Sequence, residues 1–440
     1  MNAKPLKMFI RVVSTFCFFL LILNIEAQVP AKNQEKSILL LNGTAHLGNG
    51  EIIPRAAIGF KDGKIDMVLA AFDIRMDSTK YDIIIHIDGQ HVYPGIIAPN
   101  SRLGLVEIGA VRASRDFDDV GEFSPHLRSL TAYNTESRIT PTIRTNGVLI
   151  AEVSPKGGVI SGASSIFELD GWNWEDAVLK EDNGIHLNWP SIRSTFGKKE
   201  KDVKKTEEQY KQKLLEIERF FEDAEAYQKV DFHLEKNIRF EAMKKLFSKK
   251  AKLFIHANRI QEITDAIYFF DAFDFDLVLV GGNDAYLVAD ILKDRNIPVI
   301  LRRVHSLPMN QDDAIDFPFR LPKLLSDKGL LVALENSGSM EAMGTRNLPF
   351  YAGTAAAYGV EKEAALSMIT LNTAKILGID QQVGSIEAGK QATLFVSKGD
   401  ALDMRTNQVN LAFIQGKQID LTNPQIKLYQ KYLKKYKSVD

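Results

Sequence analysis

Short apolar runs separated by amphipathic segments fill the middle of the chain, and they constrain the fold more than any other feature. The runs are residues 92–97, 148–153, 253–255, 277–280, 299–301 and 330–334. Runs of this length are typical of strands buried on both faces of a parallel sheet. Helical patterns with apolar residues three and four apart, such as 260–272 and 285–293, separate the later runs.

This alternation of strands and helices predicts an α/β fold, a (β/α)8 barrel of the TIM type. The structural alternative is a doubly wound sheet, but no glycine-rich dinucleotide-binding loop follows the first run. We therefore place the barrel at residues 94–382, with a helical insertion near 195–250.

Both ends of the chain are predicted to be β structure. In 37–93, Asp62-Gly63 and Asp88-Gly89 adjoin apolar runs, which is a hairpin signal. In 383–422, turn residues separate further short apolar runs. We expect 37–93 and 383–422 to form one small β-sandwich domain. The remaining segments are a polar linker at 28–36 and a charged C-terminal tail at 423–440.

The first 27 residues have the pattern of a secretory signal peptide. A basic front containing Lys4, Lys7 and Arg11 precedes an apolar run at 12–23, and the small residue Ala27 follows. The run is short for a membrane span, although an uncleaved anchor helix is the alternative. We expect an exported protein, periplasmic or secreted, with no membrane span after cleavage.

Cysteine usage and charge exclude several classes of function. Cys17 is the only cysteine, so none follows the predicted signal peptide. Disulfides, thiolate metal sites and a cysteine nucleophile are therefore excluded from the exported chain. The formal net charge of −1 argues against nucleic-acid binding.

Four segments carry a family resemblance that spans most of residues 37–422. They are 91–97 (HVYPGII), 157–162 (GGVISG), 372–378 (NTAKILG) and 383–392 (VGSIEAGKQA). Together they resemble the amidohydrolase superfamily, and in particular its imidazolonepropionase-like members. The resemblance implies a TIM-type barrel, a divalent metal ion such as zinc, and hydrolysis of non-peptide C–N bonds. Thr393 stands where the family pattern has an aspartate.

The metal-binding signature is where this sequence departs from the family. The family has Asp-x-His-x-His after the first barrel strand, because histidines at i and i+2 point the same way. The matching positions here are residues 98–102, Ala-Pro-Asn-Ser-Arg. Asn100 and Arg102 therefore replace both histidines, and Arg102 is a permanent cation without a lone pair to donate.

The later ligand positions are largely lost as well. His256 matches the histidine of the fifth strand, whereas Gly281 stands near the histidine of the sixth. Asn336 lies near the family's late aspartate, with Glu335 next to it on the opposite strand face. With His256 as the single matched ligand, we expect no bound metal and no other cofactor.

Arg102 has two interpretations. It replaces the charge of the lost ion and pairs with Glu152 or Glu335, or it points into a ligand pocket and holds an anion. Arg302, followed by Arg303 and His305, is a further candidate for lining that pocket.

These residues leave three functions open. The favoured one is a non-catalytic scaffold that forms a homo-oligomer or pairs with an intact amidohydrolase acting on amides or peptides. The second is an active hydrolase of small amides or peptides, with an atypical metal set including zinc or with a metal-independent site around His256, Glu335 and Asn336. The third is a periplasmic ligand-binding protein that uses its arginines.

Overall fold

The computed structural model describes residues 28–72, 78–191 and 200–437. The segment predicted to be a signal peptide lies outside the described residues. Residues Ala31–Asp440 form a compact unit, and the description below concerns that unit by itself.

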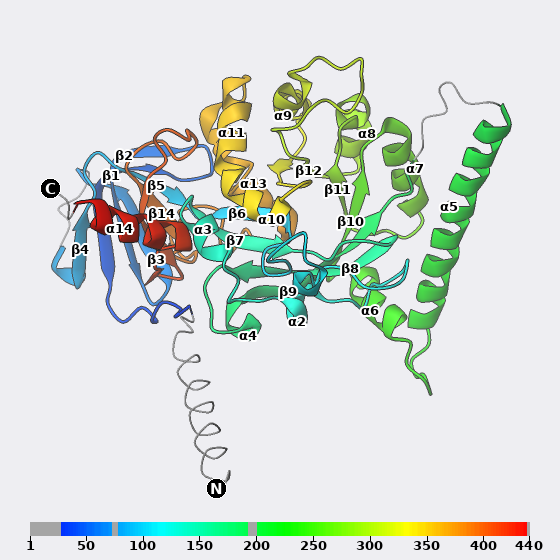
Figure 1. Ribbon diagram of the computed structural model, residues 1–440, viewed down its shortest axis with the longest axis horizontal. Helices are drawn as coiled ribbons and strands as arrows, with labels where there is room; N and C mark the ends of the chain where they lie inside the picture. Colours follow the sequence, from blue (N-terminus) through cyan, green and yellow to red (C-terminus); the bar gives the residue numbers. More distant parts are fainter. Residues whose placement is uncertain (1–27, 73–77, 192–199, 438–440) are drawn as a thin grey trace, which may run out of the picture. The chain divides into compact units, whose positions relative to one another are not determined.

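The first of two eight-stranded sheets combines both ends of the unit (Figure 1). β5 pairs antiparallel with β14, so strands from the two ends are direct neighbours. The Asp62-Gly63 turn joins β2 to β3, and both residues have positive φ, 50° and 76°, as a tight hairpin turn requires. The strands are β1 (Ile38–His46), β2 (Ile52–Lys61), β3 (Lys64–Ala70), β4 (Ile83–His86), β5 (His91–Pro94), β14 (Leu394–Ser397), β15 (Val409–Ile414) and β16 (Lys417–Gln418).

The second sheet is a nearly closed barrel with the order β13-β12-β11-β10-β9-β8-β7-β6. Its strands are β6 (Ile96–Ser101), β7 (Val148–Val153), β8 (Ile160–Glu168), β9 (Val178–Asn188), β10 (Lys252–Ala257), β11 (Leu277–Gly281), β12 (Val299–Leu301) and β13 (Val332–Leu334). β8 runs antiparallel to β7 and β9, while the other neighbours are parallel. The barrel thus differs from an all-parallel one because the β7–β8 connection is too short for a crossover helix.

Helices surround the barrel and occupy the segment near 195–250. In that segment, α5 buries Ile217, Phe221 and Ala224 against the barrel helices, and the rings of Phe221 and Phe270 are 5.0 Å apart. A helix, α14, occupies most of the predicted charged tail. The longer helices are α5 (Glu200–Gln228), α6 (Ile238–Phe247), α7 (Ile260–Phe270), α9 (Phe317–Asp327), α11 (Leu348–Ala357) and α14 (Pro424–Lys437), and the shorter ones are α2 (Ser129–Ala132), α3 (Thr140–Arg144), α4 (Trp174–Ala177), α8 (Ala289–Asp294), α10 (Glu341–Gly344), α12 (Lys362–Ser367) and α13 (Leu371–Leu377).

Within the described part of the chain, no helix combines the length and the apolar character that crossing a bilayer requires.

An apolar layer inside the barrel determines where the polar side chains point. Its members come from most of the barrel strands and from α13: Ile97, Ile150, Ile166, Phe254, Val278, Val280, Ile300, Ala333, Ala374, Ile376 and Leu377. Side chains two positions apart on a strand point to the same side. Glu152, His256, Arg302 and Glu335 each follow one of these residues by two, so they lie above the apolar layer. This is the carboxyl end of the strands, where barrel enzymes place their active sites.

Candidate functional site

Asn100 connects three barrel strands in the polar layer. Its backbone N–H donates to Glu152 Oε2 at 2.8 Å, and its side-chain amide donates to Glu335. Its Oδ1 accepts a hydrogen bond from Ser154 Oγ at 2.9 Å. The residue has a φ of +49°, which asparagine tolerates better than most residues. Asn100 is therefore fixed by contacts to β7 and to the end of β13.

Arg102 lies in the same layer and is 4% exposed. Its Nη1 donates to Ser154 Oγ at 2.6 Å and to Asn100 Oδ1 at 3.2 Å. Its Nε is 3.9 Å from Glu341 Oε1 and has no hydrogen-bond partner among the described residues. The ion pair is thus made with Glu341, not with Glu152 or Glu335 as we expected, because α10 brings that carboxylate over the barrel end.

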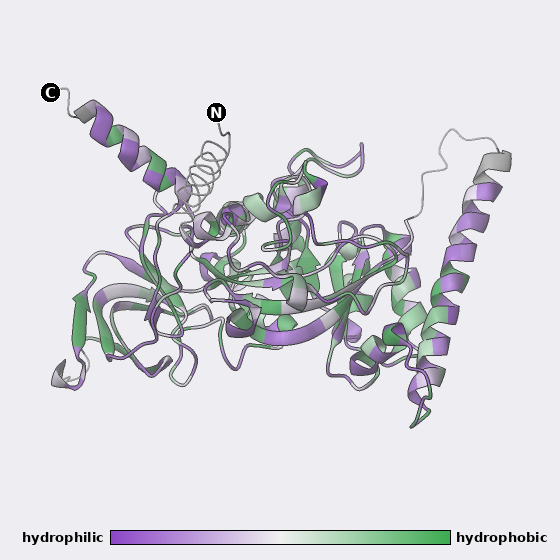
Figure 2. Cartoon of the chain, turned by 60° about the horizontal axis from the view of Figure 1, so that its bottom comes forward, coloured by the Kyte–Doolittle hydropathy of each residue, from purple (hydrophilic) through white to green (hydrophobic). Residues whose placement is uncertain are grey.

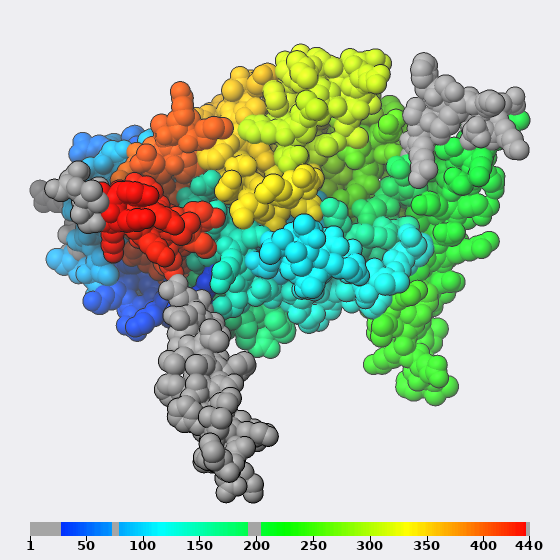
Figure 3. Space-filling view, viewed as in Figure 1, coloured from blue at the N-terminus to red at the C-terminus, as the bar shows by residue number. Residues whose placement is uncertain are grey.

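Burial lowers the pKa of Arg102, whereas the charges of Glu341, Glu335 and Glu152 raise it. The guanidinium remains protonated at any physiological pH. Glu341 also accepts from Lys156 Nζ at 3.0 Å, so the network reaches the surface. Figure 3 shows the segment after β6, in cyan, adjoining the segment around α10, in yellow.

A histidine pair extends the layer beyond β7. His256 Nε2 is 3.0 Å from His186 Nδ1, and His186 Nε2 is 3.0 Å from Glu152 Oε1. Burial raises the pKa of Glu152, but the hydrogen bond and charge of His186 outweigh it and hold the pKa below its ordinary value. An ionised Glu152 accepts the Nε2 proton of His186, so the Nδ1 side of the His186 ring faces Nε2 of His256.

His256 is partly exposed at the end of β10. Burial of its ring, together with the charges of His186, Arg102 and Lys156, lowers its pKa well below the ordinary value. The imidazole is therefore neutral at pH 7, and it is a weak base.

Glu335 and Asn336 have different environments, as strand alternation requires. Burial raises the pKa of Glu335 to about 7, although Asn100 and Arg102 act in the opposite direction. Asn336 Oδ1 accepts from Tyr351 OH at 2.5 Å, and its Nδ2 donates to the Glu341 carbonyl at 2.6 Å. Glu335 thus joins the polar layer, whereas Asn336 holds α10 and α11.

Two other predicted positions contribute less. Gly281 has a φ of +102°, and an added Cβ would lie 2.7 Å from Asn258 Oδ1, so this backbone excludes a ligating side chain. Arg302 is partly buried; burial lowers its pKa, and the charge of Glu335 raises it. The structure therefore brings together Asn100, Arg102, Glu152, His256 and Glu335, with Arg302 nearby.

Comparison with known proteins identifies the fold. Residues 304–419 match the model of the amidohydrolase family. No curated protein matches the chain. An amidohydrolase from Thermotoga maritima has a similar structure, with a TM-score of 0.73, 23% identity, and coverage of 87% of this chain and 99% of that one. Part of the chain thus matches the amidohydrolase family, and the chain as a whole shares the fold of a solved amidohydrolase.

Other solved structures share the fold at lower similarity. A putative prolidase from Bifidobacterium longum has a TM-score of 0.53 and 15% identity, covering 91% of this chain and 99% of that one. An adenosine deaminase from Xanthomonas campestris with bound zinc has a TM-score of 0.53 and 14% identity, covering 90% and 98%.

The donor set of this amidohydrolase-fold site does not fit a divalent metal ion. Glu152 and Glu335 accept hydrogen bonds from Asn100, His256 Nε2 is engaged with His186, and a guanidinium lies in the same layer. Across residues 28–72, 78–191 and 200–437, no three His, Cys, Asp or Glu side chains form a group that could hold a metal ion.

Proposed function

We propose that this chain is a non-catalytic member of the amidohydrolase superfamily that keeps its barrel as a binding scaffold. The family match at residues 304–419 and the shared fold support a hydrolase-like function in general terms. The observation that carries the proposal is the buried Arg102 guanidinium, in contact with Asn100, Ser154 and Glu341. A cation at this position supplies the positive charge that the buried carboxylates require, and it repels a divalent ion.

A site without a bound ion has no group that generates hydroxide near neutral pH. We therefore propose that the protein acts by pairing with an intact amidohydrolase chain, whose substrates are amides or peptides. The export pattern at residues 1–27 supports placing this role outside the cytoplasm. Sequencing the amino terminus of protein recovered from its host tests that location, and we expect Gln28 as the first residue.

The direct test of the proposal is metal content. A chain beginning at Gln28, produced with added zinc and manganese, is measured by elemental mass spectrometry. We expect substoichiometric metal and an unfolding temperature unchanged by a chelator. About one tightly held ion per chain would contradict the proposal.

Two variants sharpen this test. Because the guanidinium is proposed to exclude the ion, Arg102→Gln should take up more added zinc than the wild type in equilibrium dialysis. The matched control, Lys156→Gln, removes an exposed charge from the same carboxylate, Glu341, and should leave zinc uptake unchanged. Equal uptake by wild type and Arg102→Gln would show that the guanidinium does not exclude the ion.

The pairing role needs its own experiment. The chain beginning at Gln28 is used as bait in an extract of its host, and captured proteins are identified by mass spectrometry. We expect a second amidohydrolase chain that carries the complete His-x-His signature. Hydrolysis of amides by the purified bait alone would contradict a purely binding role.

A second candidate function is metal-independent hydrolysis, which the pKa of Glu335, about 7, favours. A carboxyl group with this pKa exchanges protons near neutral pH, and His256 lies in the same layer. The test is an amide and dipeptide screen in the presence of a chelator. Glu335→Gln should abolish any activity, whereas the control Glu168→Gln, at a buried carboxyl whose pKa is also raised to about 7, should not.

A further inference from the structure

The last helix, α14, separates its basic and apolar side chains onto two faces. With about 100° between successive residues, the four lysines up to position 435 fall within an arc of about 100°, and the large apolar residues fall within an arc of about 160° on the other side. The terminal Lys437 lies outside the basic arc. The basic face consists of Lys427, Lys431, Lys434 and Lys435, and the apolar face of Ile426, Leu428, Tyr429, Tyr432, Leu433 and Tyr436. No acidic residue occurs between 424 and 437.

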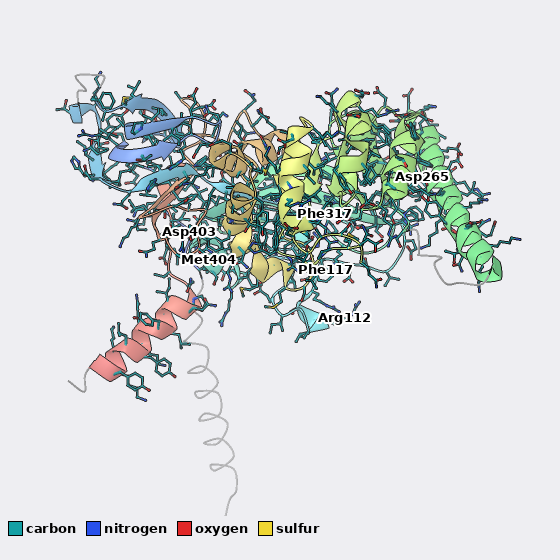
Figure 4. The ribbon with its side chains drawn as sticks, turned by 90° about the horizontal axis from the view of Figure 1, so that it is seen from above. Arg112, Phe117, Asp265, Phe317, Asp403 and Met404 are labelled. Atoms are coloured by element: carbon teal, nitrogen blue, oxygen red, sulfur yellow. The ribbon has the colours of Figure 1, made fainter. Side chains whose placement is uncertain are left out.

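Most of the apolar face is exposed. Leu428 is 56% exposed, Tyr429 66%, Tyr432 49% and Tyr436 66%. The first turn is held by a hydrogen bond of 3.0 Å from Thr142 Oγ1 to Gln425 Oε1. Figures 2 and 4 show that the later turns extend away from the rest of the unit. The described part of the unit therefore leaves this face largely uncovered.

A covering surface is needed on physical grounds. Isolated helices of about 14 residues are marginal in water, and most helical stability in proteins comes from packing of the apolar face. An exposed row of large apolar side chains marks an interaction site.

We propose that α14 docks the protein onto an anionic lipid surface, independently of the function proposed for the barrel. The lysines complement the charge of the lipid phosphates, and the apolar face enters the boundary between headgroups and acyl chains. Tyrosine suits that boundary because its ring is apolar and its hydroxyl is polar. The 14 residues of the helix are too few to span a bilayer, so it lies along the surface.

The test is vesicle co-sedimentation of a chain beginning at Gln28, since Ala31–Asp440 forms a compact unit by itself. Vesicles of phosphatidylcholine alone are compared with vesicles that also contain phosphatidylglycerol. We expect binding to the anionic vesicles only, weakened by added salt. The double variant Lys431→Gln/Lys434→Gln should bind about thirtyfold more weakly. Each lysine near an anionic surface strengthens binding by a similar factor, and the loss of both multiplies the two factors.

The matched control is Lys211→Gln/Lys213→Gln, which removes two exposed lysines from α5 and should leave vesicle binding unchanged. Tyr429→Ser/Tyr432→Ser keeps every lysine and should weaken binding about tenfold or more, because the apolar face is lost. Circular dichroism confirms that all variants are folded.

Three results would overturn the proposal. The first is the absence of binding to anionic vesicles. The second is binding to polyglutamate, a stand-in for an acidic protein, without binding to vesicles. The third is a dimer in light scattering that the tyrosine variant abolishes, which would make a second copy of this chain the partner.

Discussion

The protein contains the same three side chains, histidine–histidine–glutamate, in two places. The barrel cluster is His256, His186 and Glu152, with distances of 3.0 and 3.0 Å, and the sheet cluster is His91, His46 and Glu363, with distances of 3.0 and 2.8 Å. Each central histidine also stacks on an aromatic ring: His186 on Phe254 at 4.6 Å, and His46 on Tyr93 at 4.4 Å. The distances are therefore nearly the same, although the central ring is reversed: His186 faces its glutamate through Nε2 and His46 through Nδ1.

The surroundings differ. In the barrel cluster, both oxygens of Glu152 accept hydrogen bonds, and Arg102 and Glu335 lie in the same polar layer. In the sheet cluster, Glu363 uses Oε1, while its buried Oε2 has no hydrogen-bond partner among the described residues. The barrel cluster lies at the carboxyl ends of barrel strands, where the fold places function. A histidine–histidine–glutamate chain alone is thus no indication of a site.

The largest expected effect comes from replacing the two glutamates. In Glu152→Gln, an NH2 group replaces one of the two carboxylate oxygens and so faces a hydrogen-bond donor, either the Asn100 N–H or His186 Nε2. The substitution also removes a negative charge near Arg102. We expect a loss of about 3–5 kcal/mol in the free energy of unfolding. Glu363→Gln can direct its new amide to the place of Oε2, so its loss should be about 1–2 kcal/mol. Urea unfolding followed by circular dichroism measures both, and equal losses would remove the distinction between the clusters.

The next effect is a pH dependence that Glu335 gives to the barrel end. Its pKa is about 7 in the folded protein against an ordinary value of 4.5, so between these two pH values the folded state keeps a proton that the unfolded state has lost. The free energy of unfolding therefore falls as pH rises through this window. Glu335→Gln should be more stable than the wild type above pH 7 by up to about 3 kcal/mol, with no such gain at pH 4. Unfolding curves at several pH values decide this, and a gain that did not depend on pH would contradict the assigned cause.

A smaller effect of opposite sign is expected from the outer histidines of the two clusters. Burial lowers the pKa of His256 well below 6.5, and the charges of His186, Arg102 and Lys156 lower it further. Below pH 6.5 the unfolded state binds a proton at this histidine and the folded state does not, so the free energy of unfolding falls as the pH drops. At pH 5 this costs at most about 2 kcal/mol, which His256→Gln should recover.

His91 provides the matched comparison. Burial and the charges of His46 and Lys362 lower its pKa, whereas Asp400 and Glu363 raise it. His91→Gln should therefore recover less stability at pH 5 than His256→Gln does. An equal or larger recovery would mean that the two environments do not differ in the way their contacts indicate.

The fold class could be predicted because apolar periodicity is a property of the sequence itself. The continuous runs became buried barrel strands, and both ends of the unit contribute strands to one sheet. Strands β8 and β9 were not foreseen. Residues 160–168 contain glycine, alanine and serines, and residues 178–188 contain several charged and polar residues, so neither has the continuous apolar run that marked the other six strands.

The site could be predicted where it follows from strand alternation and not where it depends on tertiary contacts. Asn100, Arg102, Glu152, His256 and Glu335 were candidates and share hydrogen bonds or a common layer. His186 was missed, although its alternation with Ile185 and Leu187 was a usable signal. Glu341 could not have been found, because a loop and a short helix bring it to Arg102.

The smallest expected effect concerns the exposed ion pair nearest to each cluster. Lys156 Nζ lies 3.0 Å from Glu341, and Lys362 Nζ lies 2.8 Å from Asp400; the two lysine side chains are 48% and 45% exposed. Pairs this exposed contribute below about 1 kcal/mol, so Lys156→Gln and Lys362→Gln should both be nearly neutral at moderate salt. Lys156→Gln should be the more costly of the two at low salt, because Glu341 is 14% exposed and Asp400 31%. Unfolding measured at low and high salt would show the difference between the two variants disappear at high salt. A difference that persisted at high salt would mean that Lys156 belongs to the buried barrel network and not to its exposed edge.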